Sequence, residues 1–328
     1  MNIHLTFDYE LFFGDDAGSI EKCMIEPTNE LLSIFKQLTI RATFFVDAGY
    51  LFKLNELSEQ FPRLKKELQR VVEQLNAIQS QGSEIQLHIH PHWEKAMYKN
   101  NTWHFNMDNC YKLADFEQND MEEIVRKYKK CLDQYTVKPT TVFRAGGWCI
   151  QPFDRLNKVF KELNIQLDSS VIVNGEFYSE HYAFDFTSAP NKASYSFEND
   201  VCIEDENGFF VEYPISTFRY SPLFFWRLYI LGRLFPEKHK MIGDGRFLAQ
   251  PKRKKTQLSR FTWNHVSCDG YYSSKLNRAL KLLSLKEFNT MVIIGHPKSL
   301  TRYSINKLAL FCLKMHKKHR FVPFDCSK

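Results

Sequence analysis

The amino-acid sequence predicts an α/β fold in which strands and helices alternate. Short runs rich in Val, Ile and Phe are typical of buried strands, and longer stretches with leucines at helical spacing between charged residues are typical of outer helices. The length supports the same conclusion, because 328 residues with 44% hydrophobic content can bury one large core. No repeat and no low-complexity linker divides the sequence, so we expect a single domain over residues 1–328.

The expected elements follow in order from a first strand that begins at Ile3. Helices are predicted over 51–81, 117–133, 154–163, 274–285 and 304–318, and further strands over 84–88, 141–144, 165–168, 291–294 and 321–322. Between Asp168 and Ser274 the alternation lapses. There, the apolar runs 201–204 and 209–213 flank Asn207-Gly208, which is a strong hairpin signal. We therefore expect a β-hairpin within an insertion over about 172–273.

Three histidines, His88, His90 and His92, lie within five residues directly after a strand end. Neutral imidazoles are common ligands of divalent metals, and Pro91 between two of them disfavours an ordinary helix. Incidental histidines in a polar loop are the alternative interpretation. Three of them beside one strand end favour a metal site.

A carboxylate pair, Asp8 and Glu10, ends the first strand. Residues two apart on a strand share a face, so both side chains should project the same way. The carboxyl ends of strands are where α/β proteins hold their reactive groups. Two further strand ends carry polar groups: Arg144 before the glycine pair Gly146-Gly147, where backbone N–H groups can approach a ligand, and His296 after a buried run.

In order along the chain, these residues resemble the polysaccharide deacetylase family with the NodB-homology domain. The resemblance rests on Thr-Phe-Asp-x-Glu, His-x-x-x-His, Phe-Arg-x-Gly-Gly, Asp-Ser-Ser and Gly-His-Pro, which extend from Leu5 to His296; residues 42–46 are similar to that family's second strand. It implies a distorted (β/α) barrel, a divalent metal, and hydrolysis of an N- or O-acyl group on a sugar.

The resemblance also implies a role for each residue. Asp8 matches the catalytic base, and His88 and His92 match the two metal-ligating histidines. Arg144 matches the arginine that holds the base, and Gly147 falls where a backbone N–H helps stabilise the oxyanion. Asp168 and His296 match an acid–imidazole pair, in which Asp168 orients the ring and His296 protonates the leaving group. A metal with a base and an acid on opposite sides fits acyl hydrolysis.

The chain departs from the family at Tyr9, where a second aspartate usually binds the metal. Glu10 shares the face of Asp8 and can replace it, so we expect Glu10, His88 and His92 to bind Zn²⁺. The alternative is that Asp8 binds the metal and Glu10 is the base. His90 is either a further ligand or a residue that supports the ligands or contacts the substrate.

An aromatic run, 222–235, is followed by a cluster of Lys and Arg. Fourteen residues with two arginines are too few to cross ~30 Å of hydrocarbon. Either the run is an amphipathic core helix with a solvated basic loop, or residues 221–255 contact an anionic membrane surface, where aromatic rings and cations are both favoured.

The remaining expectations concern location and substrate. The eight cysteines show no CxxC and no compact framework, and the first strand begins too early for a signal peptide. We therefore expect a cytoplasmic protein with reduced thiols. If residues 221–255 bind lipid, the protein would be in peripheral contact with the inner face of the membrane. A net charge of +6 suits an anionic sugar phosphate, a lipid diphosphate or a membrane, and no nucleic-acid motif accompanies it.

We therefore predict a metal-dependent carbohydrate deacetylase that acts on a sugar nucleotide or lipid-linked glycan precursor in surface-polysaccharide synthesis. The alternatives are a glycosidase that uses Asp8 and Glu10, and an inactive barrel that binds a glycan.

Overall fold

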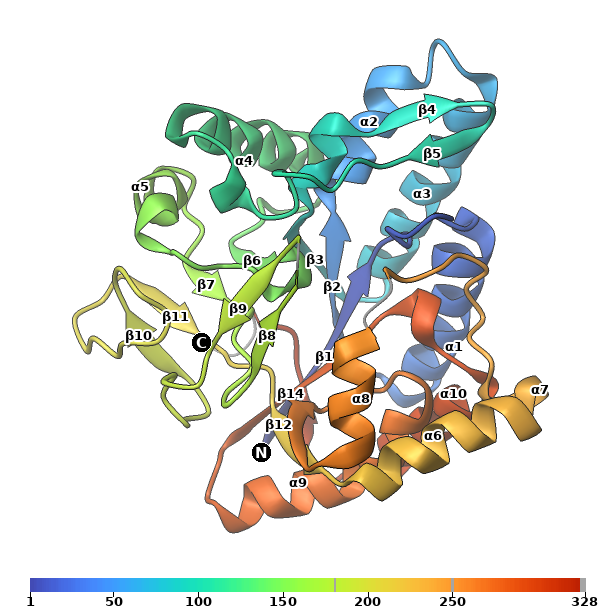
Figure 1. Ribbon diagram of the computed structural model, residues 1–328, viewed down its shortest axis with the longest axis vertical. Coiled ribbons are helices and arrows are strands. Elements are labelled where there is room, and N and C mark those ends of the chain that lie inside the picture. The colour runs from blue at the N-terminus through green and yellow to red at the C-terminus, as the bar shows by residue number, and fades with distance from the viewer. Residues whose placement is uncertain (180, 249–250, 325–328) are drawn as a thin grey trace. The chain divides into compact units, whose positions relative to one another are not determined.

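The computed structural model describes residues 1–179, 181–248 and 251–324 (Figure 1). They form two compact units that alternate along the chain. Unit 1 comprises Met1–Phe7, Leu11–Ala42 and the residues from Ile215 onward, and unit 2 comprises Asp8–Glu10 and Thr43–Pro214.

Unit 2 is built on a six-stranded sheet, in which five strands are parallel and one edge strand is antiparallel. The hydrogen-bonded order is β2 (Thr43–Asp47), β3 (Glu84–Ile89), β6 (Val142–Ala145), β7 (Leu167–Asp168), β11 (Phe210–Glu212) and β10 (Tyr195–Phe197). Strands β2, β3 and β6 are almost wholly buried, as expected for parallel strands covered by helices on both faces. Two short antiparallel pairs complete the strands of unit 2: β4 (Met97–Lys99) with β5 (Thr102–His104), and β8 (Glu176–Tyr178) with β9 (Ala183–Asp185).

The helices of unit 2 connect these strands, and one of them differs from the prediction. They are α2 (Ala48–Leu57), α3 (Pro62–Ser80), α4 (Gln118–Asp133) and α5 (Asp154–Glu162). The single helix expected over 51–81 is two helices. Phe61 is extended, with φ −125° and ψ 105°, because the residue before a proline disfavours the helical region and Pro62 then begins α3.

The hairpin of unit 2 is also shifted from its expected place. Strand β11 pairs with β10 rather than with 201–204, which form a turn. The side chain of Asp200 accepts the N–H of Cys202 and its carbonyl accepts the N–H of Ile203. Asp favours such turns, so this segment turns despite its apolar residues.

Unit 1 contains the first strand and the C-terminal elements. Through its residues 2–7, β1 (Asn2–Tyr9) pairs in parallel with β14 (Thr290–Gly295), and it also pairs with β15 (Arg320–Phe321). An antiparallel pair, β12 (Thr217–Tyr220) and β13 (Thr262–His265), brackets three helices. The helices of unit 1 are α1 (Glu26–Leu38), α6 (Pro222–Leu234), α7 (Pro236–His239), α8 (Pro251–Ser259), α9 (Leu276–Leu285) and α10 (Arg302–Met315).

The predicted α/β class is confirmed, whereas a closed barrel is not formed by the described strands of either unit. In unit 2 the sheet order ends in β10, an antiparallel strand joined to β11 alone. None of the seven cysteines in the described ranges is in a disulfide. Within those same ranges, no helix is long and apolar enough to cross a membrane.

Candidate metal site

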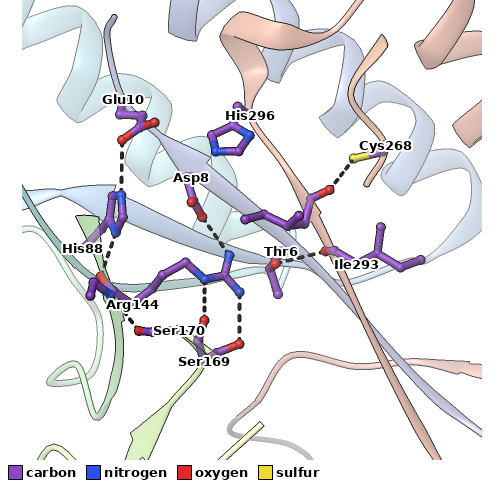
Figure 2. Close-up of polar contacts among 12 residues, drawn as sticks. Thr6, Asp8, Glu10, His88, Arg144, Ser169, Ser170, Cys268, Ile293 and His296 are labelled. Carbon is purple, nitrogen blue, oxygen red and sulfur yellow. Dashed lines mark hydrogen bonds and ion pairs between the residues drawn. The ribbon is translucent and has the colours of Figure 1, made fainter. Parts of the chain in front are cut away.

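Two imidazoles converge on one carboxylate at the carboxyl ends of the strands of unit 2. Atom Nε2 of His90 lies 2.7 Å from Oε2 of Glu10, and Nε2 of His88 lies 3.2 Å from the same oxygen (Figure 2 shows Glu10 and His88). All three side chains are buried, and one ligand atom from each lies within 4.8 Å of the others. Two nitrogens and one oxygen in this arrangement are a suitable ligand set for a divalent metal.

The tautomer of His88 supports this assignment. Its Nδ1 lies 2.7 Å from the carbonyl oxygen of Arg144, which can only accept, so Nδ1 carries a proton. When the ring is neutral, the lone pair of Nε2 is therefore the one directed toward Glu10, as in metal-ligating histidines. Burial lowers the pKa of His88, but the charges of Asp8, Glu10 and Asp47 outweigh it and raise the pKa. A divalent cation would occupy the place of the proton that this field attracts.

The third residue of the group is His90, where the sequence predicted His92. His90 keeps an extended backbone, with φ −107° and ψ 99°, and so shares the face of His88. Pro91 then begins a 3₁₀ helix, Pro91–Lys95, which changes the direction of the next side chain. The buried ring of His92 packs among aromatic rings: its centroid lies 5.7 Å from Trp93, 5.2 Å from Phe105 and 6.1 Å from Tyr111.

Asp8 lies beside the buried Arg144, as the motif resemblance implies. One guanidinium nitrogen of Arg144 donates to Oδ1 of Asp8 at 2.7 Å (Figure 2). Its Nε donates to the carbonyl of Ser169 at 2.8 Å, and its Cζ atom lies 4.1 Å from the ring centroid of Phe45. Fixed on several sides, Arg144 can hold the Asp8 carboxylate in one orientation.

Tyr9 points away from this group. Its hydroxyl donates to Oε1 of Gln74 on α3 at 2.7 Å. Alternation along β1 thus separates Tyr9 from Asp8 and Glu10, and the phenol is not a metal ligand.

Asp47, at the end of β2, is a buried carboxylate that the sequence interpretation missed. It is paired in register with His88, accepts from Nε1 of Trp93 at 2.6 Å and caps α2 through Gly49 N–H. Burial raises its pKa, and the charges of His90 and His88 partly oppose the increase. Its position directly after the apolar run 42–46 was the sequence signal that could have identified it, because the other strands also end in polar residues.

Asp168 makes contacts that differ from its predicted role. Its carboxylate accepts from the hydroxyl of Ser170 at 2.8 Å and from the Ser170 N–H at 3.0 Å. It also lies against Glu212, its partner in register on β11, and both are buried. Burial and the neighbouring Asp168 raise the pKa of Glu212 well above its ordinary value.

The acid bonded to His296 is Asp269, in unit 1. Oδ2 of Asp269 lies 2.7 Å from Nδ1 of His296, and Oδ1 accepts the backbone N–H of His296 at 2.8 Å. The motif resemblance implied that Asp168 has this orienting role. No motif marked Asp269, which is 27 residues away along the chain.

The glycine pair packs against residues of the site. Gly147 has φ +58°, and a Cβ there would lie 2.7 Å from the Tyr111 ring; one on Gly146 would lie 2.6 Å from Nδ1 of His90. Only glycine permits this close approach. The predicted role of Gly147 in stabilising an oxyanion stays a prediction.

No protein-family model and no curated protein matches the chain in sequence. Solved structures do match. The 4-alpha-glucanotransferase from Thermococcus litoralis is 11% identical with a TM-score of 0.52, covering 99% of this chain and 39% of that one. A protein from Mycobacterium smegmatis described as a polysaccharide deacetylase is 13% identical with a TM-score of 0.49, covering 99% and 87%. A variant of the peptidoglycan deacetylase PdaC from Bacillus subtilis is 11% identical with a TM-score of 0.38, covering 99% and 88%.

At these identities the likeness concerns the fold. The match above a TM-score of 0.5 shows that nearly the whole chain shares its α/β fold with part of a larger enzyme. Structures described as polysaccharide and peptidoglycan deacetylases are also among the matches, at TM-scores below 0.5.

Proposed function

We propose that the protein is a metal-dependent hydrolase that removes an acetyl group from a carbohydrate. One observation carries the proposal: Glu10, His88 and His90 converge in a buried group, next to strand ends that also hold the Asp8–Arg144 pair. Two imidazoles, one carboxylate and a position left for water are typical of catalytic zinc sites. The motif order along the sequence supports the same activity.

The chain's own residues supply the binding and proton transfers of this reaction. Glu10, His88 and His90 would hold the ion, which when bound polarises the acyl oxygen and makes water a stronger acid. Asp8, kept in one orientation by Arg144, accepts the proton of the attacking water. His296, whose ring is oriented by Asp269, is the residue that the motif resemblance assigns to protonate the leaving amine or alcohol.

A glycosidase that uses Asp8 and Glu10 fits the contacts less well. Asp8 is bonded to the buried Arg144, and Glu10 faces two imidazoles. A glycosidase needs its two carboxyls on opposite sides of a glycosidic bond and needs no metal. An inactive glycan-binding protein has no use for the Asp269–His296 pair.

Elemental analysis of protein purified without chelators tests the proposal. We expect about one divalent ion per chain, most readily Zn²⁺. Protein that lacks metal yet cleaves a glycosidic bond would identify a glycosidase instead. We further propose that the substrate is an anionic sugar nucleotide or lipid-linked glycan, because the chain carries a net positive charge. Comparing acetate release from these substrates with release from neutral oligosaccharides tests this finer proposal.

A further inference from the structure

Helix α6 of unit 1 presents a row of large apolar side chains to solvent. Leu223, Trp226, Ile230 and Leu234 are 59%, 50%, 47% and 66% exposed. Their spacing of three or four residues places them on one face of the helix. Single exposed apolar residues are common on protein surfaces, but a contiguous row marks an interaction surface.

The opposite side of α6 anchors the helix. Phe224 and Phe225 are buried, and the Phe224 ring lies 4.6 Å from Tyr220 and 5.3 Å from Tyr272. These two aromatic residues therefore belong to the core, as the alternative of an amphipathic core helix predicts. The exposed row is additional to what packing requires.

Basic residues surround this row. Residues 219–263 contain eleven Lys and Arg against two Asp and Glu, a net charge of +9, whereas the whole chain carries +6. The rest of the chain is therefore net negative. Arg227 and Arg233 on α6 and Lys254 and Lys255 on α8 are all exposed.

Direct contacts hold α8 and its cations beside α6, and the two helices lie side by side in Figure 1. Nε1 of Trp226 donates to the carbonyl of Leu258 at 3.2 Å. Nζ of Lys254 lies 4.6 Å from the centroid of the Tyr229 ring. The apolar row and the cations thus form one surface, which we call the α6–α8 surface.

We propose that the α6–α8 surface binds a bilayer that contains anionic phospholipid. Aliphatic and tryptophan side chains partition into the interfacial region, and the surrounding cations are attracted to anionic headgroups. A second copy of the chain would bring the same positive charge against itself, which disfavours self-association through this surface. The inference goes beyond the proposed function, because the surface contains none of the candidate site residues.

Vesicle co-sedimentation of the full chain tests this proposal. We expect binding to phosphatidylcholine vesicles that contain phosphatidylserine, and little binding to phosphatidylcholine alone. Replacing Trp226 and Ile230 by serine should weaken vesicle binding about tenfold or more. Replacing Lys254 and Lys255 by glutamate should do the same, because each cation near such a surface contributes about a fivefold gain in affinity. Salt above about 0.1 M should weaken wild-type binding, because it screens charges beyond about 10 Å.

Matched controls lie on α10 and just after it. Leu310 and Leu313 are 51% and 56% exposed, and Lys317 and Lys318 are an exposed pair. The double changes Leu310→Ser with Leu313→Ser and Lys317→Glu with Lys318→Glu should leave binding within about twofold of wild type. Far-UV circular dichroism checks that every variant is folded. Two results would overturn the proposal: equal binding of the wild type to both vesicle types, or an equal loss of binding in the control variants. A third would be a wild-type dimer that binds no vesicle and that dissociates when Trp226 and Ile230 are replaced by serine.

Discussion

The contact between His90 and Glu10 is the shorter of the two imidazole–carboxylate contacts in the site. Atom Nε2 of His90 lies 2.7 Å from Oε2 of Glu10. The same oxygen lies 3.2 Å from Nε2 of His88. Since both rings approach one buried carboxylate oxygen, we propose His90 and His88 as the histidine ligands. His92 instead lies among aromatic rings.

Replacing His90 and His92 separately by alanine distinguishes the two roles. His90→Ala should weaken zinc binding by more than the roughly 10–100-fold that is lost when a residue supporting a ligand is changed. His92→Ala should keep the zinc affinity but unfold at lower urea concentration, because it leaves a cavity beside Trp93 and Phe105. Competition with a chromophoric chelator measures the affinity, and the opposite pattern would restore His92 as the ligand.

Replacing Arg144 by methionine should destabilise the protein by about 3–5 kcal/mol, because Asp8 would be left buried without its counter-charge. The double variant with Asp8→Asn should lose less than the sum of the single variants. Arg126→Met is a matched control: Arg126 pairs with Glu122 and Glu162 at the surface, so its loss should cost about 1 kcal/mol or less. Urea unfolding gives the free energy of unfolding of the wild type and of each variant. Equal losses of stability in Arg144→Met and Arg126→Met would contradict the structure.

Asp269→Asn should lower acetate release by about 10²–10⁴-fold and leave the metal content unchanged, because Asp269 holds Nδ1 of His296. The same change in a His296→Ala background should have little further effect, since the two residues act as a unit. Independent, multiplicative losses would show that Asp269 acts other than through His296.

As the pH rises, the free energy of unfolding of the wild type should fall relative to that of Glu212→Gln. Burial and Asp168 raise the pKa of Glu212 well above its ordinary value of 4.5. Below that pH both the folded and the unfolded chain hold the proton; above it the unfolded chain releases the proton and the folded chain keeps it. Wild-type stability should therefore decrease by up to about 1.4 kcal/mol per pH unit until the folded pKa is reached.

Urea unfolding between acid and neutral pH measures this difference. The surface variant Glu204→Gln, which loses a contact with Lys192, should run parallel to the wild type. A constant difference between wild type and Glu212→Gln over the pH range would show that the carboxyl pair holds no extra proton.

Several parallel strands and their polar ends were predictable, because runs such as 84–88 and 141–144 are short, apolar and stop at a charged or imidazole residue. Asp8, Glu10, His88 and Arg144 follow from this pattern and from two-residue alternation along a strand. The choice between His90 and His92 was not predictable, since it depends on the residue at which the strand gives way to the 3₁₀ helix.

Long-range partners were also hidden from the sequence. Asp269 meets His296 two residues after the bridge between Ser267 and Ile294, and Glu212 meets Asp168 because β11 pairs in register with β7. The position of β10 depended on a local side-chain turn at Asp200, which outweighed the apolar run that follows it. By contrast, the break before Pro62 was visible as a proline inside a helical pattern.

Acetate release from an N-acetylated oligosaccharide, before and after metal removal, tests the central claim most directly. Chelator-treated wild type should lose its activity and regain it on addition of Zn²⁺, and Glu10→Gln treated in the same way should regain little. Full acetate release by protein shown to contain no metal, or recovery in Glu10→Gln equal to that of the wild type, would contradict a metal-dependent deacetylase built on Glu10, His88 and His90.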